Sequence, residues 1–119
     1  MDKQTVGRIG EEKACEFLVQ HSMRILERNF RCRLGELDII AWDGDQLVFV
    51  EVRTRSSDSF AAPEETVGSR KQQKLRSLAN YYLSRKFGRE INCRFDVVTL
   101  LLDREGNAVK LNHFQGAFY

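Results

Sequence analysis

Apolar residues recur at helical spacing in two stretches of the chain. The first, about Lys3 to His21, has apolar and small residues that approximate one helical face: Val6, Ile9, Gly10, Ala14, Phe17 and Leu18. The second follows the i, i+3, i+4, i+7, i+8 pattern without interruption, at Leu75, Leu78, Ala79, Tyr82 and Leu83. Ser69 is the expected N-cap of this second helix and Gly88 its stop. The pattern therefore predicts two helices.

β-branched and aromatic residues mark five further segments as strands. They are Met23 to Phe30, Glu36 to Trp42, Leu47 to Arg53, Phe95 to Leu102 and Val109 to Phe114. The second and third are separated by Asp43-Gly44-Asp45-Gln46, and Asp-Gly between such runs is a strong hairpin signal. Thr54 to Thr66, which holds the only proline, predicts a loop or an irregular crossing, and Asp103 to Asn107 predicts a turn. The order helix, three strands, helix, two strands predicts an α/β fold, with a mixed central sheet of about five strands flanked by helices.

The length of the chain and its lack of long apolar runs set the class of protein. At 119 residues the chain has the usual size of one domain, so we expect residues 1–119 to share a single core. No apolar run approaches the roughly 20 residues of a membrane helix, and the N-terminus lacks the hydrophobic stretch of a secretory signal. We therefore expect a cytoplasmic protein with no membrane partner. The cysteines Cys15, Cys32 and Cys93 fit neither a disulfide framework nor a zinc motif, so reduced and mostly buried thiols are expected.

Charge is distributed unevenly along the chain, although the net charge is only +2. Residues 35–52 contain five acids and no Lys or Arg, namely Glu36, Asp38, Asp43, Asp45 and Glu51. Residues 66–89 contain cations and no acid, namely Arg70, Lys71, Lys74, Arg76, Arg85, Lys86 and Arg89. An acidic segment followed by a basic one indicates two surfaces of opposite sign, which the net charge conceals.

The acids of the predicted hairpin are placed where they can act together. Side chains alternate between the faces of a strand, so Glu36 and Asp38 share one face, as do Glu51 and Arg53. A two-residue hairpin loop would put Glu36 opposite Glu51, whereas a four-residue loop would put Asp38 opposite Glu51 and Glu36 opposite Arg53. Both registers predict that all four side chains lie on the same face.

Opposed carboxylates in an apolar setting indicate a cation. Directly opposed residues have Cβ atoms about 5 Å apart, so two carboxylates can reach one ion but repel each other without it. The neighbouring strand residues are apolar, which makes that repulsion stronger. Oxygen ligands of this kind suit Mg²⁺ or Mn²⁺ with phosphate as a further ligand, which favours phosphodiester hydrolysis. The alternative is a solvated hairpin face with cross-strand ion pairs, such as Glu36 with Arg53.

Two segments, NFRCRLGELDIIA at 29–41 and VFVEVRTR at 48–55, resemble a known signature. They are similar to those of the small bacterial YraN-like family, UPF0102. Its members are predicted endonucleases, similar to archaeal Holliday junction resolvases and placed in the PD-(D/E)XK, restriction-endonuclease-like superfamily. The likeness extends from Gly7-Arg8-Ile9-Gly10-Glu11 to Phe95-Asp96-Val97-Val98. It implies a restriction-endonuclease-like fold.

The resemblance also assigns roles to individual residues. It makes Asp38 and Glu51 the metal-binding acids, with the Val52 carbonyl as a further ligand and Glu11 as the acid that approaches from the first helix. Glu11 lies at the border of the apolar stripe, so a surface acid is the alternative. Arg53 stands where the superfamily motif has Lys, and arginine is bulkier, planar and effectively never deprotonated. Arg53 is therefore expected either to stabilise charge in a modified nuclease or to mark a protein that has lost cleavage.

Several cations are candidates for binding nucleic acid. Lys71 extends the core-facing stripe of the second helix toward the charged end of the sheet, where it reaches a phosphate or merely covers the core edge. Together with Lys74, Arg31, Arg33 and Arg55 it would form a surface that follows phosphates without reading sequence, the alternative being a solvated helix face. Neither His21 nor His113 has a partner at a suggestive spacing. Asp96 is expected to form an ion pair with Arg94 or another cation, the alternative being that it supports the site from a neighbouring strand.

The expected function is that of a metal-dependent endonuclease that acts on DNA, with Asp38, Glu51, Arg53 and Glu11 as catalytic residues and Mg²⁺ or Mn²⁺ as cofactor. By analogy with the resolvases the DNA is branched or otherwise structured, and a homodimer is suggested because two cuts need two sites. The alternative is a non-catalytic nucleic-acid-binding module on a degenerate nuclease fold.

Overall fold

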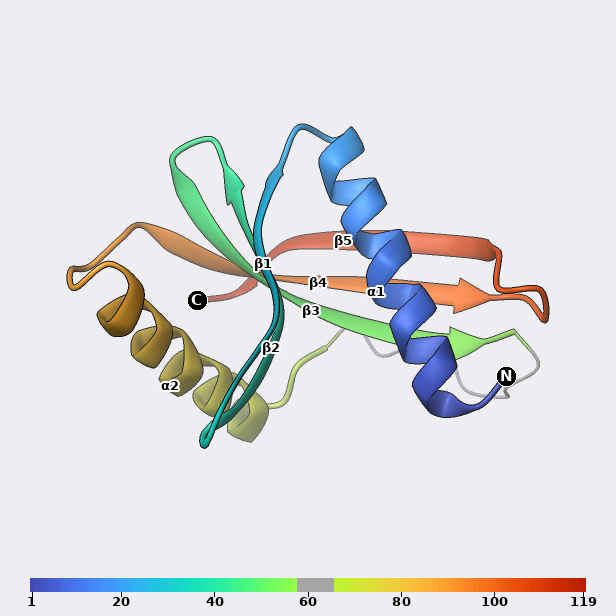
Figure 1. The fold of residues 1–119 in the computed structure, drawn as a ribbon, viewed down its shortest axis with the longest axis horizontal. Helices are drawn as coiled ribbons and strands as arrows, with labels where there is room; N and C mark the ends of the chain where they lie inside the picture. Colours follow the sequence, from blue (N-terminus) through green and yellow to red (C-terminus); the bar gives the residue numbers. More distant parts are fainter. Residues whose placement is uncertain (58–65) are drawn as a thin grey trace.

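The computed structural model describes residues 1–57 and 66–119. Two helices and five strands follow one another in the predicted order (Figure 1). They are α1 (Lys3–Gln20), β1 (Arg24–Cys32), β2 (Gly35–Asp43), β3 (Gln46–Ser56), α2 (Ser69–Lys86), β4 (Cys93–Leu102) and β5 (Ala108–Phe118). Neither helix in these ranges combines the length and the apolar character needed to cross a membrane.

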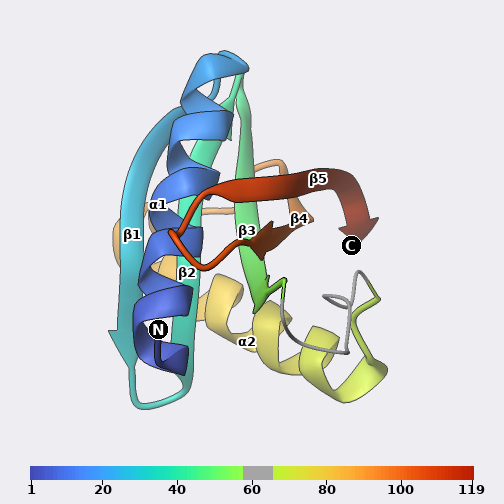
Figure 2. The ribbon, with the colours of Figure 1, turned by 90° about the vertical axis from the view of Figure 1, so that its right-hand side faces the viewer.

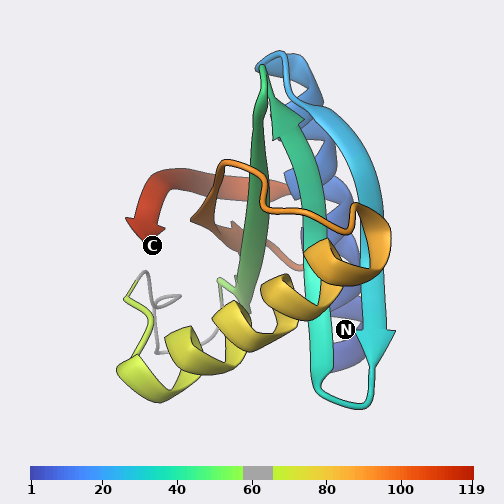
Figure 3. The same cartoon turned by 90° about the vertical axis from the view of Figure 1, so that its left-hand side faces the viewer.

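The strands form a single sheet in the order β1-β2-β3-β4-β5. Strands β3 and β4 are parallel and are joined through α2, whereas the three other neighbouring pairs are antiparallel. Helix α1 covers one face of the sheet and α2 the other (Figures 2 and 3). This confirms the predicted α/β fold with a mixed sheet of five strands between helices, an arrangement consistent with a restriction-endonuclease-like fold.

The alternation of side chains along β3 divides the core into two parts. Leu47 and Phe49 pack with the apolar face of α2, while Val48 and Val50 pack with α1. All four are almost fully buried. Each such side chain stabilises the fold by roughly 1.5–3 kcal/mol through the apolar surface that it removes from water. Because β3 contributes to both cores, the residue that follows Val50, Glu51, is held at a fixed place between the two helices.

The ends of the helices follow from local hydrogen bonds. Asp2 caps α1, and its carboxylate accepts the Thr5 amide at 2.7 Å. The prediction that Ser69 caps α2 was wrong: Gly68 is the N-cap, and Ser69 is the first helical residue. A serine one position inside the helix cannot fold its side chain back onto the first turn as a cap does. Gly88 is confirmed as the stop, because its φ of 67° suits glycine and its amide bonds Leu83 O at 3.1 Å.

Most strands extend beyond their predicted ends because pairing in the sheet supplies hydrogen-bond partners that a local pattern does not reveal. Strand β3 continues to Ser56 alongside β4, so the predicted loop from Thr54 is wrong in its first three residues. The rest of that loop falls mainly on residues 58–65, outside the described residues. The three cysteines are free thiols as expected, Cys15 buried and the other two half-buried.

Candidate metal centre

The site lies where β2 separates from β3. Their ladder ends at the pair Ile39–Val50, while β2 stays paired with β1 down to Gly35. In the same register, the next opposed positions are Asp38 and Glu51. The Val52 amide donates instead to Asp38 Oδ2 at 2.9 Å. The Asp38 carboxylate therefore takes the place of a ladder partner, which fixes its position against the backbone of β3.

The register of the hairpin selects one of the two predicted arrangements. Asp43 pairs with Gln46, so only Gly44 and Asp45 form the turn, and Gly44 supplies the required positive φ of 63°. This register places Asp38, and not Glu36, opposite Glu51. The prediction that a two-residue loop would put Glu36 opposite Glu51 was wrong, because the ladder continues one pair past Trp42–Leu47 to Asp43–Gln46 and leaves Gly44 and Asp45 as the turn. A pairing shifted by two residues would have placed Glu36 opposite Glu51 instead of Asp38.

Burial and like charge act together on Asp38. Removal from water, the neighbouring Glu51 charge and a hydrogen bond between the two carboxyls together raise the pKa of Asp38 to about 8. The Val52 amide opposes this shift, since it stabilises the ionised form. The Glu51 side chain is only 13% exposed. Two interacting carboxyl groups are thus held in a poorly solvated position, where a cation would favour their ionised forms.

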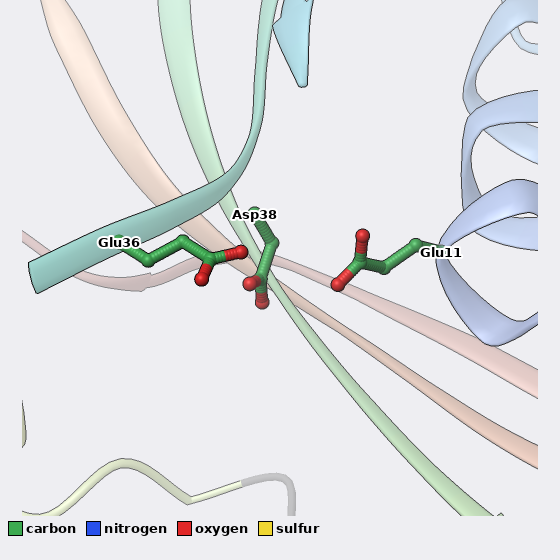
Figure 4. A group of neighbouring side chains, drawn as sticks. All are labelled: Glu11, Glu36 and Asp38. Carbon is green, nitrogen blue, oxygen red and sulfur yellow. The ribbon is translucent and has the colours of Figure 1, made fainter. Parts of the chain in front are cut away.

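Helix α1 brings a third acid to Asp38. Oxygen atoms of Glu11, Glu36 and Asp38 lie within 4.8 Å of one another, and the side chains converge from α1 and β2 (Figure 4). Burial and the Glu36 charge raise the pKa of Glu11. The structure therefore places Glu11, which the sequence left between site and surface, beside the acids of the hairpin.

Gly10 explains how α1 comes so close to the sheet. A Cβ atom built on Gly10 would overlap the side chain of Thr54 on β3. Glycine thus permits contact between the helix backbone and the strand at the residue before Glu11. The sequence showed Gly10 only as a member of the apolar stripe, and no local signal distinguishes a close approach of this kind from an ordinary small core residue.

Two cations meet the Glu51 carboxylate. Lys71 Nζ, from α2, lies 3.5 Å from Glu51 Oε2, and an Arg53 guanidinium nitrogen lies 3.8 Å from the same oxygen. Arg53 also donates to Thr66 O at 2.9 Å. Lys71 thus reaches the site as well as the core edge. Glu36 does not form the alternative cross-strand ion pair with Arg53. It accepts a hydrogen bond from Arg31 Nε at 3.1 Å instead.

A cleft of about 600 Å³ opens beside the acids. Glu11, Val52 and Arg53 line it on the side of the site, and Lys3 and Arg55 add positive charge. The Val52 side chain packs against the core beneath α1, so this residue links the strand backbone at Asp38 to the cleft wall. Lys3 was missed by the sequence reasoning, because only the packing of α1 on β3 brings the helix N-terminus here.

The other predicted nucleic-acid residues do not form one surface. Arg31 and Arg33 lie at the tip of the β1–β2 hairpin, and Lys74 of α2 lies over Gly35 at that tip. Arg55 lies at the end of β3, in the cleft next to α1. All four side chains belong to exposed residues. The positive charge is therefore divided between the hairpin with α2 and the cleft.

A second polar group lies between β4 and β5, and its Asp96 lines one small cavity together with Asp38 and Glu51. Asp96 is buried and accepts from Arg94 at 3.0 Å, from the His113 ring at 2.8 Å and from the Gly116 amide at 2.9 Å. Burial alone would favour the neutral acid, yet these hydrogen bonds lower the pKa of Asp96. The expected Arg94–Asp96 pair is confirmed. His113, for which the sequence offered no partner, binds this carboxylate from the neighbouring strand.

Comparison with known proteins places the chain among proteins of one description. The model of the uncharacterised protein family UPF0102 matches residues 10–100. A UPF0102 protein of Pelotomaculum thermopropionicum is 47% identical, over 98% of this chain and 97% of that protein. Another, of Moorella thermoacetica, is 48% identical, over 99% of this chain and 98% of its own length. The matches cover the helix, the hairpin and the strands that carry the acids.

Proposed function

The chain belongs to the UPF0102 family, and we propose that it is a metal-dependent endonuclease that hydrolyses phosphodiester bonds in DNA. The observation that carries the proposal is that the half-buried carboxyl residues Asp38 and Glu51 line one small cavity where β2 leaves β3. Glu11 and Glu36 stand beside them, and a cleft with cationic walls opens next to Glu11.

The donor set fits a hard divalent cation. All side-chain donors here are carboxylate oxygens, which Mg²⁺ and Mn²⁺ prefer. The pKa of Asp38 is raised by burial and by repulsion from Glu51, and such an ion would relieve that repulsion. Asp38, Glu51 and Glu11, with the Val52 carbonyl, are the residues that would hold it. When bound, the ion supplies a water of lowered pKa and neutralises charge on the transition state.

The residues of the chain position the substrate around that ion. The Val52 amide fixes the Asp38 carboxylate, so a group that would hold the ion is already oriented. Lys71 and Arg53 form ion pairs with Glu51 and can donate hydrogen bonds to a phosphate oxygen that enters the site. Lys3 and Arg55 would hold the phosphates that follow along the cleft. Structured or branched DNA is the proposed substrate, with a homodimer making the paired cuts and the cytoplasm as its place of action.

One observation favours a second candidate, a nucleic-acid-binding module without cleavage. Arg53 and Lys71 both lie within ion-pair distance of Glu51, so two cations already neutralise this carboxylate. Arg53 also stands in the position where the related nucleases have Lys. In this candidate the two cations pair with Glu51 to stabilise the fold, and DNA binding depends on salt but not on divalent ions.

Cleavage assays with matched variants separate the two candidates. A supercoiled plasmid and a four-way junction are incubated with the protein in Mg²⁺ or Mn²⁺, and calorimetry follows binding of each ion. The nuclease predicts nicking that is lost in Asp38→Asn and Glu51→Gln, because each substitution removes a charged ligand. Cleavage that survives both substitutions would remove the proposed mechanism.

The substitution Arg53→Lys tests the unusual position directly. In a modified nuclease, Arg53→Lys changes the rate but leaves the dependence on Asp38 intact. Metal binding without cleavage in the natural protein, with cleavage recovered in Arg53→Lys, would identify a nuclease that has lost its activity. Salt-dependent DNA binding that no divalent ion affects would instead support the binding module.

A further inference from the structure

A second pocket lies between β1 and the C-terminal half of α2. Its volume is about 400 Å³, within the roughly 300–1,000 Å³ of small-molecule sites. Figure 3 shows the C-terminal end of α2 crossing the β1–β2 hairpin, where the pocket forms. Its walls combine aromatic rings (Phe30, Tyr81 and Tyr82) with cations (Arg31, Arg85 and Lys86).

The aromatic wall is held rigidly from behind. Phe30 packs edge-on against Tyr82, with ring centres 4.9 Å apart, and its centre lies 6.4 Å from that of Tyr81. Tyr82 is 2% exposed and donates from its hydroxyl to Glu27 at 3.0 Å. Phe30 and Tyr81 are only half-buried. They therefore offer aromatic surface, and packing on the core holds the Phe30 ring in place, which lowers the entropy cost of stacking.

The cations give the pocket a positive rim. The Arg85 guanidinium lies over the Tyr81 ring, 5.5 Å from its centre, and donates to the Tyr81 hydroxyl at 3.2 Å. Arg31 and Lys86 are exposed on either side. Three cations face one acid, Glu27, among the lining residues, so the pocket favours an anionic ligand with a planar group.

One residue connects this pocket to the acids of the candidate metal centre. Arg31 lines the pocket, and its Nε donates to Glu36 Oε2 at 3.1 Å. Glu36 in turn lies within the 4.8 Å group formed with Asp38 and Glu11. A DNA strand whose phosphates pass the acids would therefore reach the pocket after crossing only the Arg31–Glu36 pair.

We propose that this pocket binds one unpaired nucleotide of a DNA strand, with the base stacked on Phe30 and Tyr81 and the adjoining phosphates held by Arg31, Arg85 and Lys86. The pocket has the volume of a small-molecule site, and a base inside a duplex must first be unstacked to enter it. The link to cleavage rests on the proposed endonuclease, whereas nucleotide binding itself does not. The pocket thus selects DNA that has unpaired nucleotides next to the cut.

Binding in the absence of metal tests this inference independently of cleavage. Fluorescence anisotropy follows a labelled single-stranded oligodeoxyadenylate and a duplex of the same length, in a buffer with chelator and constant salt. The expected result is tighter binding of the single strand. In Tyr81→Ala, single-strand binding weakens by about 5- to 150-fold, the range found for loss of one stacked base. In Tyr81→Phe it stays close to that of the natural chain.

Control variants separate stacking from folding and from general charge. Tyr119→Ala removes a tyrosine that is 72% exposed and does not line the pocket, so it should leave binding unchanged. Arg85→Gln, an exposed position that does not support the core, should weaken binding more than Arg24→Gln at an exposed residue outside the pocket. Equal single-strand binding by Tyr81→Ala and the natural protein would overturn the inference, as would equal effects of Arg85→Gln and Arg24→Gln.

The two proposals fail in different ways. Cleavage that depends on Asp38, together with equal affinity for single strand and duplex, would refute the pocket and leave the endonuclease standing. Single-strand binding that depends on Tyr81, without cleavage in Mg²⁺ or Mn²⁺, would refute the endonuclease and leave the nucleotide pocket standing. A natural chain that binds no single strand at all would refute the pocket.

Discussion

The pH dependence of stability around Asp38 gives a quantitative test of the candidate metal centre. Burial and Glu51 raise the pKa of Asp38 from 3.8 to about 8. In the unfolded chain the group ionises near pH 3.9. Because the folded protein binds this proton more tightly, the free energy of unfolding falls as pH rises from about 4 to about 8, and it stays low above that range.

The size of the effect follows from the shift. A difference of about 4 pKa units corresponds to on the order of 5 kcal/mol between the protonated and ionised folded states, shared by the Asp38–Glu51 pair. Asp38→Asn removes the charge but keeps an oxygen that can accept the Val52 amide. In chelator at about pH 8 the variant should therefore be more stable than the natural protein, by on the order of 3 to 5 kcal/mol. Near pH 4 the two should converge.

Urea unfolding at several pH values measures this difference, first with chelator and then with Mg²⁺ or Mn²⁺. A bound ion should narrow this difference, because a ligand at 100 times its Kd stabilises the natural protein by about 2.7 kcal/mol. Asp45→Asn, in the exposed hairpin turn, is the matched control and should change stability by less than about 0.5 kcal/mol. If Asp38→Asn is less stable than the natural protein at every pH in chelator, the carboxylate is not held against like charge and the reasoning fails.

Three further predictions concern packing, the second polar group and DNA binding. Gly10→Ala should cost about 1–3 kcal/mol in urea unfolding and weaken metal binding, whereas Gly7→Ala, with open space at its Cβ, should be neutral or slightly stabilising. Asp96→Asn removes the buried carboxylate that Arg94, the His113 ring and the Gly116 amide contact, while Arg94 keeps Asp43, so it should cost about 1–3 kcal/mol, and a loss below about 0.5 kcal/mol would contradict the role of this group. Arg55→Gln should reduce the salt slope of duplex binding by about 1, and Lys110→Gln, exposed on β5, should not; equal slopes would exclude Arg55 from the phosphate path.

Local patterns in the sequence were sufficient for the order and type of all seven elements. Helical periodicity identified α2 because its five core side chains face one way, and alternation with a strong turn identified the β2–β3 hairpin. These signals are short-range, so they survive without knowledge of the fold. They were weaker at boundaries: β3 runs on to Ser56 because β4 pairs with it, and Ser69 is not a cap because the chain enters α2 one residue earlier.

The arrangement of the acids was only partly accessible in this way. Alternation along the hairpin singled out Asp38 and Glu51, but two registers remained open, and they exchange Asp38 for Glu36 opposite Glu51. The structure decides this through the Asp43–Gln46 pair at the turn. A register depends on the geometry of two strands together, so neither strand's own pattern fixes it.

What the sequence determined by itself was the set of local elements and the concentration of acids in one hairpin, because both follow from residue types at short spacing. Only the tertiary structure brought Glu11 of α1 to Asp38, Lys71 of α2 to Glu51, and His113 to Asp96. It also raised the pKa of Asp38, since burial depends on residues from both sides of the sheet. Contacts between distant segments arise from packing of whole elements, and that packing has no signature in the spacing of neighbouring residues.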